Sequence, residues 1–499
     1  MVDQQESGTS YNHIFKTTFV FGFVQVFKAI IAIARNKIVA VLIGTEGMGL
    51  ISIFASTTSM IKTGAGLGLD QSAVRDVSEA YGSNERAKYS RIINVTTRVV
   101  LLTGLLGMLV TIIMSHWLSI WTLGGTEYTI SYCFLGIGVF LDIMNDGRQA
   151  LLKGTRQLKS LAYASIIGSF VALLTSVPLF YILGKEGIVP ALLIASACAL
   201  LVSEYFLRKI DFDKLKISFN ETIKTAKPML VMGSAMMLMT LLQAVVALII
   251  QAFIRSKGGL NDVGLYGAGN AILQSYFGII ITALMTDYYP RIAAVNSNNE
   301  KLQDELIKQS KISLLMCGPL FVVFMSFLPF FVQFLFSKDF LPATDYIGFA
   351  IYYTLITVCS NQVDMILVAK FKVSTFTILS VIIRCVQLLL CISLYSLCGL
   401  KGLGVATLLL GVFHYLTMTT VVYRLYKIKF DKTFYRLAAV ILLFALASSG
   451  ISYFHSLTIR YSIGVVLSIA SLSYSYVISQ RVLGVNFKSV IKSKISRDN

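Results

Sequence analysis

Residues 47–91 read GMGLISIFASTTSMIKTGAGLGLDQSAVRDVSEAYGSNERAKYSR, and a weaker copy of this stretch returns in the second half of the chain. The copy begins with Val263-Gly264-Leu265-Tyr266 in place of Met48-Gly49-Leu50-Ile51 and ends with Ser297-Asn298-Asn299-Glu300 in place of Ser83-Asn84-Glu85. The separation between the two copies differs by one residue between the start and the end of the stretch. A repeat of this kind, built from whole membrane helices, predicts two related bundles packed around a shared central site.

The chain is too apolar for a soluble protein, because 56% of its 499 residues are hydrophobic, 14% are charged and the mean hydropathy is +0.74. A membrane-spanning helix needs roughly 20 mostly apolar residues. Fourteen segments meet this requirement, at about residues 14–43, 47–72, 89–115, 128–151, 158–183, 187–208, 227–254, 262–290, 307–335, 343–370, 373–397, 401–426, 433–454 and 459–481. The sequence therefore predicts an all-α integral membrane protein, a polytopic helical bundle. The polar segment Met1–His13 lacks the features of a cleavable signal, so we expect the first helix to be retained.

The net charge of +18 lies almost entirely in alternate loops. Lys and Arg gather after the even-numbered spans and in the C-terminal tail, whereas the opposite loops hold only Lys185, Arg255, Lys257, Lys338, Lys401 and Arg460. By the positive-inside rule, we expect both termini to be cytoplasmic. This distribution indicates a membrane, and not a nucleic acid, as the partner of the positive charge.

The expected organisation is an N-terminal lobe at residues 1–208, a cytoplasmic linker at 209–226, a C-terminal lobe at 227–426, two additional helices within 433–481 and a basic tail at 482–499. The linker is basic and partly amphipathic, a pattern that fits either a tether or a regulatory segment. The additional helices carry few polar residues, which suits either a hydrophobic wall or a lipid-facing groove.

Ionisable residues inside the predicted spans form the candidate site, because each costs roughly 2.5 to 3.5 kcal/mol at the bilayer centre and needs a partner or a wet cavity. In the first span, Lys28 and Arg35 lie one heptad apart on a face that also carries Gln25, so we expect all three to face a cavity and bind substrate. Lys37 points the opposite way near the outer end, where its side chain can snorkel to the surface.

The second and fourth spans supply charges of both signs. Lys62 lies at mid-depth shortly before Gly64 and Gly68, which fits either a hinge beside a cationic substrate site or close packing against another helix. One polar stripe in the fourth span is interpreted as a cytoplasmic gate or a structural ion-pair network, and consists of Asp142, Asn145, Asp146 and Gln149. Its candidate partners are Arg75, Arg91, Arg98 and Arg148.

The second half of the chain supplies fewer intramembrane charges. Arg384 and Gln387 share one face of the eleventh span, and Asn361 and Asp364 of the tenth span reach a similar depth. Arg384 is either paired with Asp364 or part of an anion site. We favour the site, with Gln387 and Asn361 beside it, because arginine binds phosphate bidentately.

Two arginines occupy repeat-related positions, each shortly after an aspartate. Arg75 follows Asp70, and Arg291 follows Asp287. We expect both arginines to hold the cytoplasmic mouth in ion pairs, so that all four residues, together with Asp142, Asp146 and Asp364, contribute to gating or ion coupling.

The sequence carries no motif for a metal or nucleotide cofactor. The seven cysteines show no CxxC or Cys/His spacing and the four histidines are scattered, so we expect no metal site. There is no Walker-type phosphate-binding motif, so we expect no nucleotide cofactor. Coupling to Na⁺ or H⁺ through Asp70, Asp142 or Asp146 stays open.

With these residues in place, the chain resembles the O-antigen translocase type of lipid-linked oligosaccharide flippase, in the polysaccharide transporter family of the multidrug/oligosaccharidyl-lipid/polysaccharide exporter superfamily. The resemblance rests on Ala34–Ala40, Gly44–Leu50, Gly64–Gly68, Val74-Arg75 and the repeat at Gly264–Arg291. It implies two six-helix lobes in a V and a central cationic cavity. It also implies that an undecaprenyl-pyrophosphate-linked sugar chain moves across the bacterial inner membrane by alternating access. Many relatives have twelve spans, so the last two helices depart from the pattern.

The resemblance implies a transporter and not an enzyme, with a polymerase and glycosyltransferases of the same pathway as partners, and we expect a monomer. The membrane potential would assist export of the anion by roughly 2.3 kcal/mol per charge per 100 mV. A multidrug or cation antiporter of the same fold is one alternative, but it would need carboxylates in the cavity. A polysaccharide polymerase is the other, and the short outward loops argue against it.

Overall fold

The computed structural model describes residues 2–83, 85–451 and 456–483. Within these ranges it describes the side chains from Phe27 onward, except those of residues 275, 276, 279, 283, 286, 287, 457, 482 and 483. Every regular element in this part of the chain is a helix. The predicted all-α polytopic fold class is therefore confirmed.

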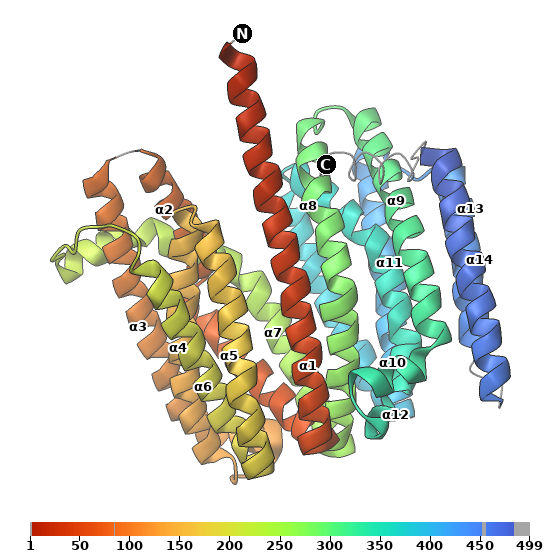
Figure 1. Ribbon diagram of the computed structural model, residues 1–499, viewed down its shortest axis with the longest axis horizontal. Helices are drawn as coiled ribbons and strands as arrows, with labels where there is room; N and C mark the ends of the chain where they lie inside the picture. Colours follow the sequence, from red (N-terminus) through yellow and green to blue (C-terminus); the bar gives the residue numbers. More distant parts are fainter. Residues whose placement is uncertain (1, 84, 452–455, 484–499) are drawn as a thin grey trace, which may run out of the picture. The chain divides into compact units, whose positions relative to one another are not determined.

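The chain divides into two compact units (Figure 1). The first comprises the residues up to Gly267 together with Leu335–Asp339, and the second comprises Ala268–Phe334 and the residues from Phe340 onward. The helices up to the first boundary are α1 (Val2–Gly66), α2 (Leu69–Gly82), α3 (Arg86–Leu118), η1 (Ser119–Leu123), α4 (Thr129–Gly154), α5 (Leu158–Leu183), η2 (Gly184–Gly187), α6 (Ile188–Leu207) and most of α7 (Phe219–Asn270).

The rest of the chain is also helical. It forms η3 (Ala271–Phe277), α8 (Gly278–Ala294), α9 (Asn299–Ser326), α10 (Leu328–Leu335), η4 (Lys338–Phe340), α11 (Ala343–Ala369), α12 (Val373–Tyr426), α13 (Lys432–Gly450) and α14 (Leu457–Leu483). The first unit contains the part of α7 that the expected boundary at residues 209–226 would assign to the second lobe. Compact units and expected lobes are thus different divisions of the chain, and the lobe boundaries remain a prediction.

Nine ranges of the described chain are long and apolar enough to cross a membrane. Four of these ranges hold two helices each, which meet at Gly44, η2, Gly259 and Gly399. Helix α4 is not among the nine, since it carries Asp142, Asp146 and Arg148. The nine ranges therefore contain thirteen helical segments, and α4 is the fourteenth. These segments correspond to the fourteen spans expected from the sequence. The first helix is longer than expected, because α1 already begins at Val2.

The internal repeat is visible in the backbone. Three pairs of residues with positive φ share one separation along the chain: Gly44 (68°) and Gly259 (75°), Arg156 (56°) and Phe371 (56°), and Gly184 (56°) and Gly399 (57°). Glycine adopts this conformation without the steric penalty of a Cβ, which suits the sharp turns at Gly44 and Gly259. Helix ends follow the same period, since α4 ends at Gly154 and α11 at Ala369. The repeat predicted from the sequence is therefore confirmed, with the period that separates Gly49 from Gly264.

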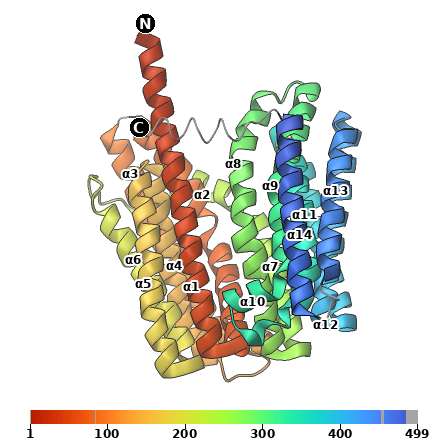
Figure 2. The same cartoon turned by 45° about the vertical axis from the view of Figure 1, so that its right-hand side comes forward.

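The two additional helices, α13 and α14, both pack against α9 (Figure 2). Helix α14 buries a row of small side chains, Ser468, Ser471, Ser475 and Ser479, and small residues at this spacing let helices approach closely. At the start of α13, Asp431 Oδ2 lies 2.7 Å from Lys311 Nζ of α9. The additional helices are therefore a packed part of the second unit.

Candidate functional site

A polar cavity of about 240 Å³ lies inside the first unit, between residues of α1, α2, α3, α4 and α7. Its ionisable lining residues are Lys62, Asp70 and Asp146, and Thr240 of α7 adds a hydroxyl. The volume suits water and small ions, because a single water needs only about 10 to 15 Å³ of such space. The cavity as it stands is too small for a sugar chain.

The cavity borders a break between α1 and α2. Helix α1 ends at Gly66, and the next two residues, Leu67 and Gly68, have positive φ values of 51° and 64°. Gly68 lies so close to Gly233 of α7 that a Cβ on either residue would overlap the backbone of the other segment. The sequence left a hinge and close helix packing as alternatives for this glycine-rich stretch. The structure shows close packing of α7 at a real interruption of the helix, shortly after Lys62.

Lys62 forms an ion pair inside the first unit. Its Nζ lies 2.9 Å from Asp146 Oδ2, and the two side chains are 32% and 36% exposed. The sequence prediction placed Lys62 with the substrate and Asp146 with the gate, so the structure joins two residues that had been assigned separate roles. In this state the Lys62 ammonium is neutralised, and the cavity holds one ammonium against two carboxylates.

The predicted partners of the α4 stripe were wrong for Asp146. Arg148 Nε instead lies 2.7 Å from Glu204 Oε2, and Arg91 Nη2 lies 2.7 Å from Glu221 Oε1. The reason is helical geometry. Arg148 follows Asp146 by two positions and points to another side of α4, toward α6. The stripe is divided in the same way, because Asn145 accepts a hydrogen bond from Ser203 of α6 at 2.7 Å.

Arg75, the predicted gate arginine of the first half, lies outside the predicted spans. Its Nε is 3.6 Å from Asp76 Oδ1, and its Nη1 is 2.7 Å from the sulfur of Met232. Burial raises the pKa of Asp76 above its ordinary value, although the neighbouring Arg75 lowers it. Asp70, its expected companion, lines the cavity.

Lys28 and Arg35 differ from the other intramembrane cations. Both side chains are half-buried on α1, and neither forms a hydrogen bond or ion pair with another residue of the described chain. Lys28 is partly buried, and the like charge of Lys153 also acts on it. The side chain of Gln25, predicted on the same face, lies outside the described residues.

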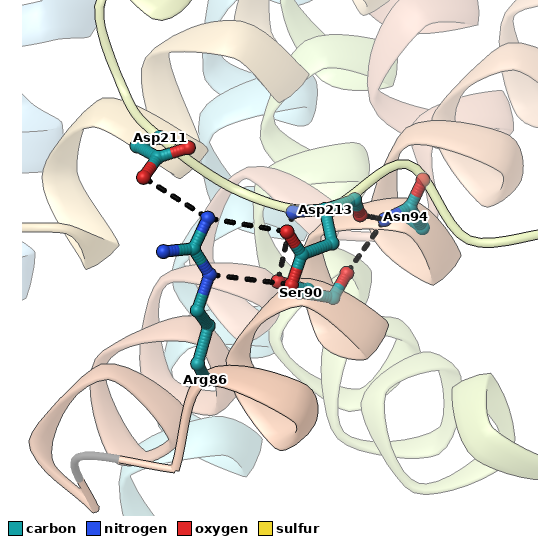
Figure 3. A network of polar contacts seen from close by, with 5 residues as sticks. All are labelled: Arg86, Ser90, Asn94, Asp211 and Asp213. Atoms are coloured by element: carbon teal, nitrogen blue, oxygen red, sulfur yellow. Dashed lines mark hydrogen bonds and ion pairs between the residues drawn. The ribbon is translucent and has the colours of Figure 1, made fainter.

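The linker after α6 is held against α3 by a polar network (Figure 3). Arg86 binds Asp213 through two hydrogen bonds, Nε to Oδ2 at 3.2 Å and Nη2 to Oδ1 at 3.1 Å, and it also lies 3.0 Å from Asp211. Ser90 accepts from the Asp213 amide at 3.0 Å, and Asn94 donates to the Asp213 carbonyl at 2.8 Å. Sequence alone left this linker as a tether or a regulatory segment, and the structure shows that it is docked.

In the second unit, Arg384 Nη1 donates to Gln387 Oε1 at 2.8 Å, so the predicted proximity of these two residues is confirmed. Asp364 instead meets His414 of α12, with its Oδ2 at 3.1 Å from His414 Nε2. His414 was not predicted as a site residue, because the four histidines are scattered along the chain and only a metal-ligand spacing would have marked one of them. Asn361 is half-buried on α11, one turn before Asp364.

Arg291, the predicted gate arginine of the second half, is also paired. Its Nη1 lies 2.6 Å from Glu305 Oε2 of α9, and its Nη2 donates to Gln309. The side chain of Asp287, predicted beside it, lies outside the described residues. The site roles proposed for these residues remain predictions.

Comparison with known proteins gives consistent results. The model of a family described as "Polysaccharide biosynthesis protein" matches residues 38–345. A protein of Shigella flexneri, provisionally described as an O-antigen transporter, is 23% identical over 303 residues, which are 59% of this chain and 70% of that protein.

Two solved structures share the fold. The lipid II flippase MurJ, in an inward closed conformation, matches with a TM-score of 0.69 at 14% identity over 94% of this chain and 100% of that one. An inward-facing MATE family multidrug transporter of the MOP superfamily matches with a TM-score of 0.60 at 16% identity over 81% and 99%. Since the family model covers more than half of the sequence, this chain belongs to the polysaccharide biosynthesis protein family.

Proposed function

We propose that this protein is a flippase that moves an undecaprenyl-pyrophosphate-linked oligosaccharide from the cytoplasmic to the periplasmic leaflet of the bacterial inner membrane. It acts as a transporter and not as an enzyme, by alternating access. Three findings support this proposal: membership of the polysaccharide biosynthesis family, the relative provisionally described as an O-antigen transporter, and the fold shared with the lipid II flippase.

The observation that carries the proposal is the pair Lys28 and Arg35. Each is a half-buried cation on a membrane helix without a hydrogen bond or ion pair in the described chain. A cation in that position is costly unless a ligand or water compensates it. A diphosphate group carries charge of the opposite sign, and the guanidinium of Arg35 can bind two of its oxygens at once.

Lys62 acts at a different stage of the same cycle. In the present state Asp146 neutralises it, so Lys62 becomes available to an anion only when the pair separates. A diphosphate that enters the cavity competes with Asp146 for the ammonium, and it thereby favours the state in which the cavity is wider. A ligand shifts such an equilibrium only through its differential affinity for the two states.

The decisive experiment compares charge-removing variants in a strain that lacks the protein. Lys28→Ala and Arg35→Ala should each leave lipid-linked oligosaccharide in the cytoplasmic leaflet at normal protein levels. Lys37→Ala is the matched control, because it removes a cation from the opposite side of the same helix and should retain transport. Full complementation by both Lys28→Ala and Arg35→Ala would refute the anion site.

One observation favours a second candidate, a multidrug or cation antiporter. The cavity beside Lys62 is lined by two carboxylates, Asp70 and Asp146, which suit a cationic ligand better than an anionic one. The MATE family multidrug transporter has the same fold. Resistance to cationic dyes conferred by the wild-type protein and lost in Asp70→Asn, with lipid-linked oligosaccharide export unchanged when the protein itself is deleted, would favour this function over the flippase.

A further inference from the structure

Asp364 and His414 form a polar pair in the interior of the second unit. Asp364 lies on α11 and His414 on α12, and their side-chain contact of 3.1 Å joins Oδ2 to Nε2. The residues are only 8% and 9% exposed. The second carboxylate oxygen, Oδ1, is buried and has no hydrogen-bond partner in the described chain. A buried carboxylate with one unsatisfied oxygen is unusual and points to a missing ligand.

The charge of this pair depends on one proton. With a neutral imidazole, the pair carries a net negative charge inside a membrane protein. One added proton makes the pair neutral, whether it resides on the ring or on Oδ1. A carboxylate next to an imidazole gives the proton two acceptors in contact.

Two cations on the packed helices α8 and α9 have carboxylate partners of their own. On α8 and α9, Arg291 is matched by Glu305, and Lys311 by Asp431. On α12, Arg384 donates a hydrogen bond to Gln387. The charges of Arg384 and Asp364 both reach the Tyr353 phenol of α11. The packed helices also carry the buried phenols and thiols of Tyr288, Cys317, Cys359 and Tyr415, among other titratable groups. The side chain of Asp287 on α8 lies outside the described residues.

We propose that Asp364 and His414 form a proton-binding site in the second unit, distinct from the Lys62 cavity. The proton enters from one side of the membrane, binds the pair, and leaves to the other side when the helices rearrange. The pair then returns to a carboxylate and a neutral imidazole, so no charge is gained or lost over the cycle. Coupling of this proton to export rests on the proposed flippase function, whereas the binding site itself does not.

The test uses the fact that the chain has only four histidines. Replacing His13, His116 and His455 with glutamine leaves His414 as the single imidazole, and ¹⁵N NMR of the full-length protein in nanodiscs then reports its protonation between pH 4.5 and 9. The matched control retains only His116, whose side chain is exposed on α3. We expect Asp364→Asn to weaken proton binding at His414 about tenfold and to leave His116 unchanged.

Asp364→Glu keeps the carboxylate and covers the case in which Asp364→Asn does not fold. It should keep the affinity of His414 for the proton within about threefold of the wild type. An identical titration of His414 in the wild-type, Asn and Glu proteins would overturn the proton site.

A second measurement separates this inference from the flippase proposal. Undecaprenyl pyrophosphate is added to the reconstituted protein, and a pH dye records any proton released or taken up. We expect a change with the wild type and none with His414→Gln. If the lipid does not bind but His414 still responds to Asp364, the flippase proposal fails and the proton site stands. Binding of the lipid without any proton change would overturn the coupling.

Discussion

Gly49 and Gly264 lie against each other and occupy equivalent positions in the two copies of the internal repeat. A Cβ on Gly49 would sit 3.1 Å from the Gly264 amide nitrogen and overlap the Leu260 carbonyl. A Cβ on Gly264 would sit 3.1 Å from the Gly49 amide nitrogen and overlap the Thr45 carbonyl. Leu260 and Thr45 are themselves repeat mates, so the contact has local two-fold symmetry. Two helix backbones touch there, which only glycine allows.

Gly49→Ala and Gly264→Ala should therefore each destabilise the protein. The added methyl group meets backbone atoms, which cannot move aside as a flexible side chain can, and overpacking of this kind costs about 1 to 3 kcal/mol. Thermal unfolding in detergent measures the loss. Gly348→Ala is the control, because a Cβ there meets nothing within 4 Å and alanine favours a helix over glycine by about 0.5 to 1 kcal/mol. Equal stability of Gly49→Ala and Gly348→Ala would contradict the close contact.

The pair of Asp431 and Lys311 predicts a pH dependence of stability. Burial opposes ionisation of Asp431, but hydrogen bonds from Lys311 Nζ at 2.7 Å and from the Phe434 amide at 2.8 Å lower its pKa below the ordinary value. A carboxylate whose folded-state pKa is lowered stabilises the protein above its unfolded-state pKa, about 3.9, and this contribution is lost as the pH falls through the lower folded-state value. Because the Asp431 side chain is 38% exposed, solvent screening keeps the effect below about 1 kcal/mol.

Asp431→Asn isolates the charge, because asparagine still caps the start of α13. The variant should be less stable than the wild type at pH 7, and the difference should shrink as the pH falls below about 4. Asp304→Asn, an exposed change on α9, is the control and should show no such convergence. A difference between Asp431→Asn and the wild type that stays constant down to pH 3 would mean that the ion pair does not stabilise α13.

The network around Arg86 predicts that the linker can be released by one substitution. Arg86→Gln removes the double hydrogen bond to Asp213 and the contact with Asp211. Exposed Lys214 and Lys216 in the linker should then be cleaved by trypsin several times faster. Arg208→Gln loses an exposed ion pair with Glu204 outside this network and serves as the control. Unchanged cleavage of Arg86→Gln would show that the apolar contacts of Ile210 and Phe212 hold the linker by themselves.

Much of the fold was predictable because its signals are local. Runs of apolar residues indicated the spans, and the recurrence of a glycine-rich stretch indicated the repeat, since both depend only on order along the chain. The break after Gly66 was less predictable. The glycines marked a weak point, but an interruption there depends on the contact of Gly68 with Gly233, which is distant in sequence.

The ion pairs were harder to predict for a related reason. Depth and helical face can be estimated from the sequence, whereas the neighbour across a helix interface cannot. Lys62 and Asp146 were both identified as intramembrane charges, yet their contact depends on how α1 and α4 pack. His414 and Asp364 lie on different helices, and nothing in either segment indicates the other.

The pairing of Lys62 with Asp146 predicts that Asp146 sets the electrostatic potential of the cavity. A cysteine in place of Thr240, which lines the cavity, reports this potential when the seven native cysteines have been replaced. We compare its labelling by a negatively and a positively charged thiosulfonate reagent. Asp146→Asn removes one negative charge and frees Lys62, so the negative reagent should gain about tenfold over the positive one, as expected for one unit charge a few ångströms away in a partly solvated site.

Two further variants show whether the contact with Lys62, and not the overall charge of α4, controls this ratio. Lys62→Met should shift the ratio in the opposite direction, because it leaves the carboxylates of the cavity without their ammonium. Asp142→Asn, one turn earlier on α4 and outside the residues that line the cavity, should change the ratio much less than Asp146→Asn. If Asp142→Asn and Asp146→Asn had equal effects, the charge of α4 as a whole would control the cavity, and the role of the pair in releasing Lys62 to an anionic substrate would have to be abandoned.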